Sequence, residues 1–307
     1  MKSIRIAGYG ATPALDEVPI PDIGPDDVLV RVKAAGFNPL DVKLQSGAVH
    51  DFFPLTFPYA VGTDLSGTVE QVGSSVSRWH AGDYVVARVD PLSGGGFAEL
   101  AAVPAALVAA APKTTSLNDA AGIPTAACTA WQALFEVAHL QAGQTVLIHA
   151  GAGGVGSFAI QFAHAAGARV IATASSTGIG ISRGLGADVV IDYASQSFEN
   201  ELSGVDVVLD TVAGETQQRS FGVLRPGGIL VATPYPPDEE GAKAHNVTAG
   251  FVFHRSNGEL LHTVIDKIDA DRVTVLVDRT VPLTNFSEAF AYQASGRARG
   301  KILVSVS

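Results

Sequence analysis

The sequence contains a single cysteine, Cys128, in 307 residues. One cysteine excludes an intrachain disulfide and any zinc site built from several cysteines. Cys128 lies in an apolar stretch with Ala126, Ala127 and Trp131, so we expect it to be a small buried residue of a helix. The competing role for a lone cysteine is that of a catalytic nucleophile.

Positive charge and long apolar runs are scarce as well. The chain has 20 Lys and Arg residues against 30 Asp and Glu, a net charge of −10, which argues against nucleic acid or an anionic membrane as a partner. The most apolar window, residues 101–111, is too short to span a bilayer and contains Pro104. Residues 1–5 show no apolar core of the kind found in signal peptides. We therefore expect a soluble, cytoplasmic protein.

A glycine-rich turn is the most informative feature that is present. Residues 149–156 read His-Ala-Gly-Ala-Gly-Gly-Val-Gly, directly after the apolar run Thr145–Ile148 and before a stretch with helical spacing, residues 157–166. A dinucleotide site needs a strand, a glycine turn and a helix in this order, because backbone N–H groups and a helix N-terminus must approach the pyrophosphate. The pattern Gly151-x-Gly153-x-x-Gly156 alone is weak, since 33 glycines predict about 0.4 chance matches.

The surrounding strands supply the rest of a nucleotide-binding unit. Four further apolar runs follow at suitable spacing, over residues 168–174, 188–193, 205–210 and 228–232. Strands without polar alternation are buried on both faces, which predicts a doubly wound parallel (Rossmann) sheet covered by helices. The alternative is a doubly wound domain whose glycine turn binds nothing.

The two ends of the chain have a different pattern. Residues 28–33, 66–72 and 84–89 are alternating runs separated by turns, which predicts a mostly antiparallel, barrel-like β domain. Ser116 is a good helix start. Towards the C-terminal end we expect a helix from Asn257, a strand over residues 273–281, a helix over 287–295 and a strand over 301–306. We expect this tail to return to the first domain, giving one domain of residues 1–118 with 257–307 and a Rossmann domain of residues 119–256.

Together these motifs resemble the medium-chain dehydrogenase/reductase superfamily, and within it the zinc-free quinone oxidoreductase branch. The resemblance covers nearly the whole chain, and it implies a GroES-like first domain and a homodimer. The segments that carry it, besides the glycine turn, are residues 34–41, 57–67, 95–99, 129–131, 185–188 and 300–303.

The resemblance also predicts the chemistry. Zinc alcohol dehydrogenases of this superfamily bind zinc through Cys, His and Cys, and the matching positions here are Asn38, Thr63 and Thr125, none of which is a good zinc ligand. We therefore expect no metal, and direct hydride transfer from a reduced nicotinamide to a quinone or an α,β-unsaturated carbonyl. A zinc-dependent alcohol dehydrogenase would require metal in the purified protein.

Asn38, Lys43 and Thr63 are the predicted catalytic residues. Asn38 and Lys43 are candidates for hydrogen bonding the oxygen on which negative charge develops. Lys43 lies where zinc enzymes of the family often have a proton-relaying histidine, so its role is either to donate the proton or to anchor the nicotinamide ribose. The competing roles are a helix cap for Asn38 and a solvated surface residue for Lys43. We assign Asp41 to structure.

The end of the second Rossmann strand favours NADPH over NADH. It reads Ala174-Ser175-Ser176-Thr177, with hydroxyl groups and no carboxylate to repel a 2′-phosphate, and Arg183 is the nearest cation. The resemblance places further positions at the cofactor. The predicted cofactor-binding residues are Thr125, Thr129, Gly151, Gly153, Gly154, Val155, Gly156, Ser175, Ser176, Arg183, Tyr193, Thr211, Val212, Thr233 and Phe253.

The main competing function is a catalytically weak NADPH-binding redox sensor or a structural protein on the same fold. NADPH binding without turnover would favour it. Variable segments at residues 50–53 and 235–240 are expected to line a pocket for a planar small-molecule acceptor, whose identity the sequence leaves open.

Overall fold

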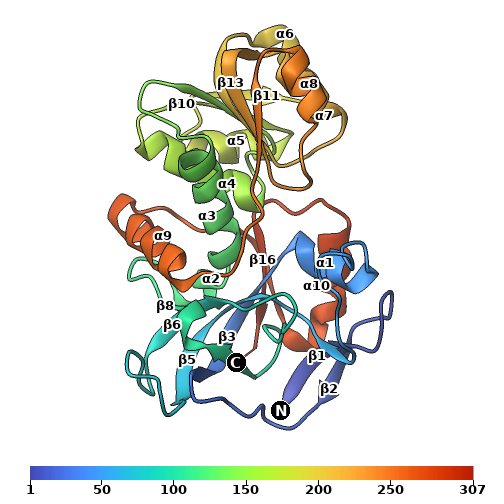
Figure 1. Ribbon diagram of the computed structural model, residues 1–307, viewed down its shortest axis with the longest axis vertical. Helices are drawn as coiled ribbons and strands as arrows, with labels where there is room; N and C mark the ends of the chain where they lie inside the picture. The colour runs from blue at the N-terminus through green and yellow to red at the C-terminus, as the bar shows by residue number, and fades with distance from the viewer. Residues whose placement is uncertain (307) are drawn as a thin grey trace. The chain divides into compact units, whose positions relative to one another are not determined.

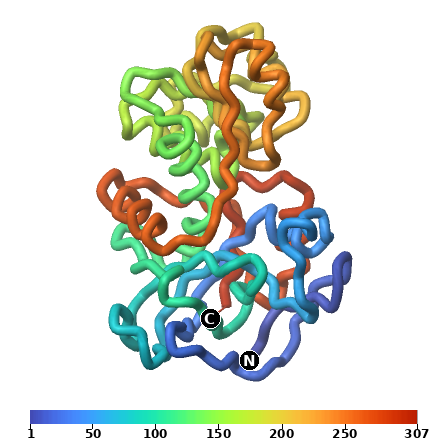
Figure 2. Tube along the Cα trace, in the orientation of Figure 1, coloured from blue at the N-terminus to red at the C-terminus, as the bar shows by residue number. Residues whose placement is uncertain are grey.

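The computed structural model describes residues 1–306, which form two compact units. The first unit contains residues 1–125 and the C-terminal segment that starts at Arg255, and the second contains residues 126–254. The trace in Figure 2 leaves the first unit once and returns to it once, so the first unit is discontinuous in sequence. Helix α2 (Leu117–Ala120), capped as expected by Ser116, contacts strands of the first unit, and the crossing follows at Thr125.

The second unit is built on a six-stranded parallel sheet (Figure 1). Its apolar strands are covered on both faces, as the sequence predicts, and an edge strand that we did not predict, β14, completes it. Counted along the chain, the strand order is 3-2-1-4-5-6, the order of dinucleotide-binding sheets. Across the sheet the strands are β11 (Val189–Asp192), β10 (Arg169–Ala174), β9 (Thr145–Ile148), β12 (Val205–Asp210), β13 (Leu224–Ala232) and β14 (Thr248–Phe251).

Helices cover both halves of this sheet. Helices α4 (Gly154–Ala165) and α5 (Thr177–Gly184) contact β9, β10 and β11. Helices α7 (Glu215–Phe221) and α8 (Glu239–Ala244) contact β12, β13 and β14. The chain runs from β9 outwards to β11 in one direction and from β12 outwards to β14 in the other. Because parallel strands are joined by right-handed crossovers, the two pairs of helices lie on opposite faces of the sheet. Three further helical segments are α3 (Pro124–Trp131), the π-helical η2 (Gln132–Val137) and α6 (Phe198–Glu201).

The first unit contains two sheets, in which every pairing except β15–β16 is antiparallel. The expected antiparallel β domain is confirmed. The larger sheet has the order β15 (Val277–Pro282), β16 (Lys301–Ser305), β3 (Asp27–Phe37), β5 (Asp64–Val72), β6 (Tyr84–Arg88) and β8 (Val108–Ala110), with β7 (Leu100–Pro104) also paired to β3. The smaller sheet has the order β2 (Ala14–Glu17), β1 (Lys2–Ile6) and β4 (Tyr59–Ala60).

Segments from both ends of the chain share the core of the first unit. Phe37 at the end of β3 packs against Phe97 and Phe286, with ring centroids 5.0 and 5.2 Å away, and Ile302 and Val304 of β16 belong to the same cluster. Burying three aromatic rings and two branched side chains together ties the C-terminal segment to β3.

The helices of the first unit are α1 (Pro39–Ser46), α2, α9 (Gly258–Asp271) and α10 (Phe286–Ala294), with short 3₁₀ segments at Ala105–Leu107 and Leu283–Asn285. Helix α9 begins as predicted at Asn257, whose side chain accepts hydrogen bonds from two N–H groups of the first turn. The strand that we expected to start at Val273 starts at Val277, because Arg272 is left-handed and the Val273 N–H still bonds to the helix.

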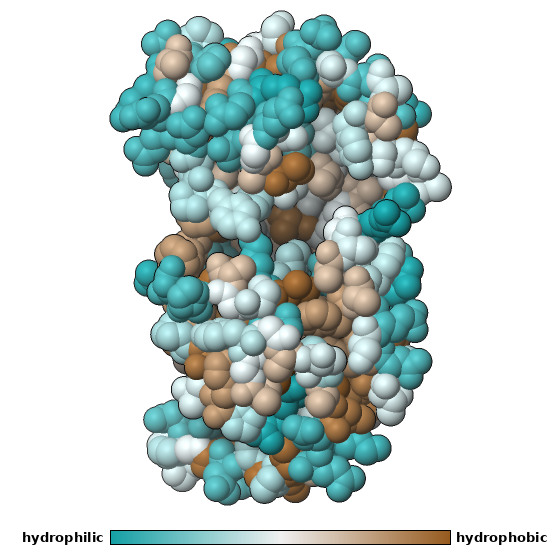
Figure 3. All heavy atoms as spheres, turned by 90° about the vertical axis from the view of Figure 1, so that its right-hand side faces the viewer, coloured by the Kyte–Doolittle hydropathy of each residue, from teal (hydrophilic) through white to brown (hydrophobic). Residues whose placement is uncertain are grey.

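The surface mixes polar and apolar residues, which appear interspersed as teal and brown spheres on the face in Figure 3. Within residues 1–306, no helix has the length and apolar character that a membrane crossing requires.

Candidate active site

The glycine turn of the second unit depends on glycine at two positions. A Cβ on Gly156 would lie 2.3 Å from the Ala150 carbonyl oxygen, and one on Gly151 would lie 2.8 Å from the Ala172 Cβ. Ala150 itself has a positive φ of 51°. Glycine at these two positions lets α4 pack closely on β9 and β10. A side chain at either position would fill the space beside the backbone of the turn.

Helix α4 starts at this turn without a side-chain cap. Its N-cap residue is Gly153, so no side chain satisfies the first backbone N–H groups, which belong to Gly154, Val155 and Gly156. Uncapped N–H groups at the positive end of a 12-residue helix, beside glycines, suit a phosphate group. These residues fit the pyrophosphate of a dinucleotide.

The end of β10 carries two serines. The Ser175 hydroxyl donates to the Tyr193 hydroxyl at 2.9 Å, which links the ends of β10 and β11. Ser176 is exposed and has φ 50° and ψ −124°, a strained conformation for a residue with a side chain. Asp192 of β11 pairs in register with Ala174 at the end of β10, and its Oδ1 accepts the Ala194 N–H.

Arg183 lies further from this strand end. It is exposed on α5, seven residues after Ser176, and a rise of 1.5 Å per residue puts it about 10 Å along the helix axis. A contact between Arg183 and a 2′-phosphate therefore needs its side chain to turn back along the helix, and it stays a prediction.

Except for Thr129, the remaining predicted residues of this unit follow the carboxyl ends of its strands. Thr211 follows β12, and its hydroxyl donates to the His149 carbonyl at 2.9 Å, across the point where the strand order reverses. The backbone N–H of Thr233, after β13, donates to the Asp210 carbonyl. Val212 and Phe253 are exposed, whereas Thr129 is buried on α3. Their contacts with a cofactor stay predictions.

His149 is buried behind the glycine turn and is neutral. Its Nε2 lies 2.8 Å from the Ser220 hydroxyl, which itself donates to the Thr216 carbonyl, so Nε2 carries the proton. Its Nδ1 lies 3.1 Å from the Thr173 hydroxyl. Burial lowers the pKa of His149 to about 4, although the negative charge of Asp210 opposes this shift.

In the first unit, Asn38 and Thr63 are in contact. Asn38 Nδ2 donates to Thr63 Oγ1 at 3.3 Å, and the carboxamide oxygen of Asn38 accepts a hydrogen bond of 2.5 Å from the Lys301 ammonium. All three residues are buried, with exposed fractions of 2, 0 and 3 %. Two of the three positions that the resemblance assigns to zinc ligands are thus joined through an amide.

The third of these positions, Thr125, belongs to a neighbouring, partly buried network. Its hydroxyl donates to Asp64 at 2.6 Å and lies 3.0 Å from Arg88 Nε, which donates to it. Arg88 also donates to the Ser256 hydroxyl at 2.8 Å, and the Lys301 ammonium lies 3.7 Å from Asp64. The Thr125 hydroxyl is therefore already hydrogen bonded within this unit, and its contact with a cofactor stays a prediction.

Asp41 is fully buried at the start of α1. Its Oδ2 accepts the Asn38 backbone N–H at 2.8 Å, which caps the helix as the structural assignment expects. Its Oδ1 has no hydrogen-bond partner among residues 1–306. Burial raises the pKa of Asp41 to about 7, and the nearby positive charges of Lys301 and Arg88 only partly offset it.

Lys43 lies on α1, five residues after Asn38 and near the end of the helix. Its side chain is half-buried rather than fully solvated. Its catalytic role stays a prediction.

Comparison with known proteins agrees with this architecture. Residues 24–113 match the alcohol dehydrogenase GroES-like domain, and residues 185–304 match the zinc-binding dehydrogenase family. The chain is 35% identical to 2-methylene-furan-3-one reductase of Solanum lycopersicum, covering 99% of this chain and 79% of that protein. It is 32% identical to the chloroplastic quinone-oxidoreductase homolog of Spinacia oleracea, covering 99% of this chain and 98% of that protein. The Escherichia coli quinone oxidoreductase, solved in complex with NADPH, superposes with a TM-score of 0.89 at 25% identity over both whole chains.

The chain belongs to the medium-chain dehydrogenase/reductase superfamily. Its similarities lie with the quinone oxidoreductase branch, as the sequence motifs predict, and it is an oxidoreductase.

Asn38, Thr63 and Thr125 are the positions that the resemblance matches to zinc ligands, and each carries an amide or a hydroxyl group. Among the described residues, no group of three or more His, Cys, Asp or Glu side chains is arranged to hold a metal. Asn38 bonds directly to Thr63, and Thr125 bonds to Asp64, the residue after Thr63. Cys128 is buried in α3, as expected. The donor set fits an amide and hydroxyl site better than a zinc site.

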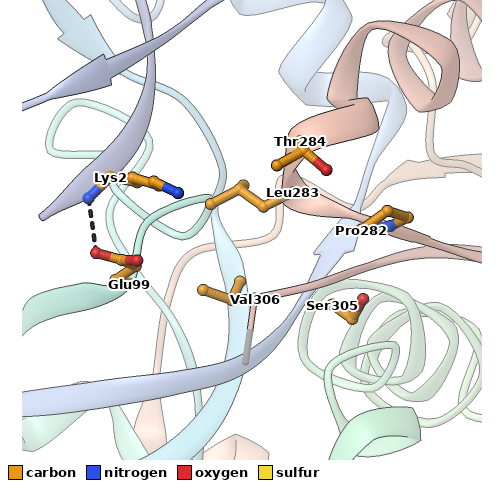
Figure 4. Close-up of a pocket in the computed structure, with 7 residues that line it drawn as sticks. All are labelled: Lys2, Glu99, Pro282, Leu283, Thr284, Ser305 and Val306. Atoms are coloured by element: carbon orange, nitrogen blue, oxygen red, sulfur yellow. Dashed lines mark hydrogen bonds between the residues drawn. The ribbon is translucent and has the colours of Figure 1, made fainter.

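A shallow pocket elsewhere in the first unit contains none of the predicted site residues. Figure 4 shows it between the start of β1 and the end of β16, where the Glu99 carboxylate accepts the Lys2 backbone N–H at 2.7 Å. Its residues are Lys2, Glu99, Pro282, Leu283, Thr284, Ser305 and Val306. No aromatic ring and no hydrogen-bonded donor pair like that of Asn38 and Thr63 lines it.

Asp64, Arg88 and Lys301 are site residues that were not predicted from the sequence. The signal was present for Lys301, since it is the one charged residue in the buried run of β16, and for Arg88, which ends the apolar run of β6. The partners of Lys301 come from the end of β3 and from β5, and those of Arg88 come from α3 and from the segment before α9, so neither set could be assigned from local sequence.

Proposed function

We propose that this protein is a zinc-independent, NADPH-dependent reductase of quinones or α,β-unsaturated carbonyl compounds. The observation that carries the proposal is the Asn38–Thr63 pair, which holds hydrogen-bond donors where zinc enzymes of the superfamily hold a metal. An acceptor that is already electron-poor needs donors at its carbonyl oxygen rather than a Lewis acid.

The second unit supplies the features of a nucleotide site. Gly151, Gly153 and the uncapped start of α4 would hold the pyrophosphate, and Ser175 and Ser176 would meet the 2′-phosphate. NADPH, when bound, supplies the hydride for the reduction. The NADPH complex of the Escherichia coli relative supports this choice of cofactor.

The residues of the first unit would stabilise the charge that develops on the acceptor. Thr63 Oγ1 accepts from Asn38, so the Thr63 hydroxyl proton and the second N–H of Asn38 Nδ2 are the two donors that we assign to the acceptor oxygen. Hydride addition leaves a negative charge on that oxygen, and a proton completes the reduction. Lys43 would either deliver this proton or bind the nicotinamide ribose.

An acceptor panel tests the proposal. Loss of 340 nm absorbance is measured with NADPH or NADH and a set of small quinones and enones, with and without a chelator. We expect turnover that prefers NADPH and does not change with the chelator. Thr63→Val removes one proposed donor at nearly constant volume, and kcat should fall about 100-fold. Lys43→Ala should lower kcat with an altered pH profile if Lys43 is the proton donor, and raise KM for NADPH if it is an anchor.

Tight NADPH binding without turnover across the panel would contradict the proposal and favour the redox-sensor alternative. Turnover abolished by chelator and restored by Zn²⁺ would favour an alcohol dehydrogenase. The homodimer and the cytoplasmic location stay predictions, and the similar plant protein is chloroplastic.

A further inference from the structure

Lys301 places a charged side chain inside the first unit. Its ammonium donates to the Phe37 carbonyl at 2.9 Å and to Asn38 Oδ1 at 2.5 Å, and it lies 3.7 Å from Asp64 Oδ2. The side chain is 4 % exposed, and burial lowers its pKa, an effect that the charges of Asp64 and Asp41 oppose. Removing an ammonium from water costs several kcal/mol, and an apolar side chain of similar volume is often at least as stabilising. Stability alone therefore gives no reason for a lysine here.

The contact with Asn38 gives a reason. The two ends of a carboxamide have nearly the same shape, so only hydrogen bonding distinguishes its oxygen from its nitrogen. An ammonium can only donate hydrogen bonds. It can therefore bond to the Asn38 carboxamide only when the Asn38 oxygen, and not the nitrogen, faces Lys301. The same arrangement directs Asn38 Nδ2 to Thr63.

The charge also acts on the strength of the amide as a donor. A charge-assisted hydrogen bond to the oxygen withdraws electron density from the amide, and bonds in such a chain strengthen one another inside a protein. The N–H groups of Asn38 become better donors on the side opposite Lys301.

We propose that Lys301 is a positioning residue, which holds the Asn38 carboxamide with its N–H groups turned to Thr63 and to the carbonyl oxygen of the acceptor. This inference rests on the proposed function, because it assigns Asn38 to the acceptor oxygen. Lys301 itself does not touch the acceptor and acts through Asn38.

Kinetics of Lys301→Met test the proposal. Methionine is unbranched and apolar and fills a similar volume. With NADPH and 1,4-benzoquinone or 3-buten-2-one, we expect kcat to fall 10- to 100-fold while KM for NADPH changes less than twofold. In an Asn38→Ala background the same substitution should change kcat less than twofold, because its effect passes through Asn38. Equal losses in both backgrounds, or no loss in the first, would overturn the proposal.

The matched control is Ser66→Ala. Ser66 is also fully buried in this unit, and its hydroxyl bonds to the carbonyls of Leu117, at 2.5 Å, and Ala34. It should lower stability while leaving kcat within twofold of wild type. Lys301→Gln, which keeps N–H donors, should recover part of the kcat lost in Lys301→Met. If the methionine variant does not fold, Lys301→Gln replaces it in the kinetic test.

A measurement without turnover separates this inference from the proposed function. The side-chain amide signals of Asn38 in a ¹⁵N-correlated NMR spectrum are assigned by their loss in Asn38→Ala. In wild type they should exchange slowly with water. In Lys301→Met or Lys301→Gln they should shift and exchange at least 10-fold faster, and in Ser66→Ala they should not. Unchanged signals in the Lys301 variants would refute the positioning role even if no acceptor is reduced. An inactive wild type that shows the shifts would contradict only the proposed function.

Discussion

Asp41→Asn should change how the stability of the first unit depends on pH. The native carboxyl has a pKa of about 7 because it is buried, against an ordinary value of 3.8. Between these values the folded protein binds the Asp41 proton more tightly than the unfolded chain does. The free energy of unfolding therefore falls as pH rises through this window and is constant above it. At about 1.4 kcal/mol per pKa unit, the whole effect is about 4 kcal/mol.

The side chain of the Asp41→Asn variant does not titrate, but it keeps an oxygen that can accept the hydrogen bond from the Asn38 backbone N–H. Its stability relative to wild type should therefore rise by about 3 kcal/mol between pH 5 and pH 8, whatever constant offset the substitution introduces. Comparing two proteins at each pH cancels the contribution of other titrating groups.

Urea unfolding followed by tryptophan fluorescence measures the difference. Trp79 lies in the first unit with Asp41, and Trp131 lies in the second, so both proteins should carry Trp131→Phe. Asp22→Asn, which makes the same substitution at an exposed carboxylate of this unit, is the matched control. A difference for Asp41→Asn that stays constant within about 0.5 kcal/mol from pH 5 to pH 8 would mean that native Asp41 is ionised, and the burial argument would be wrong.

Three other predictions concern the second unit. Gly156→Ala should weaken NADPH binding at least 10-fold by calorimetry, because its Cβ would lie 2.3 Å from the Ala150 carbonyl; Gly180→Ala has no atom within 4 Å and should bind normally, and equal affinity in both would refute the packing argument. Ser175→Asp should raise the Kd of NADPH at least 10-fold more than that of NADH, since a carboxylate repels the 2′-phosphate; parallel changes would place the 2′-phosphate elsewhere. His149 should stay neutral at pH 5 in NMR titrations, because burial lowers its pKa. Between pH 6.5 and about 4 the unfolded chain binds a proton at His149 that the folded protein does not, so the free energy of unfolding falls as pH falls through this window. A titration midpoint near 6.5 would contradict the buried assignment.

The sequence predicts the Rossmann unit well because its signals are local. The strands β9 and β12 have the bounds that their apolar runs indicate, and α4 begins at the glycine turn. Strand β14 (Thr248–Phe251) escaped prediction because Ala249 and Gly250 give it little apolar or β-branched character, and it is a strand only through its pairing with β13.

The first unit was predictable in outline but not at its polar centre. Asn38 was singled out from its motif, whereas its contact with Lys301 joins residues 263 positions apart in sequence. Such a pair depends on the order β16-β3-β5, which no local pattern specifies. The same applies to Arg88, whose partners Thr125 and Ser256 come from two further segments.

The discontinuity of the first unit has a consequence for biosynthesis. Strand β16 pairs with β3, yet the ribosome makes the whole of the second unit between them. During that time the growing chain can fold its nucleotide-binding unit, while β3 is paired with β5 and β7 but lacks β16, and the rings of Phe37 and Phe97 lack the cover of Phe286. The amide of Asn38 receives its ammonium partner only when residue 301 has emerged. A chain that stops before β16 would contain the whole second unit with its glycine turn, but its Asn38 would lack the hydrogen bond from Lys301. The order of synthesis therefore completes the proposed cofactor site before the proposed acceptor site.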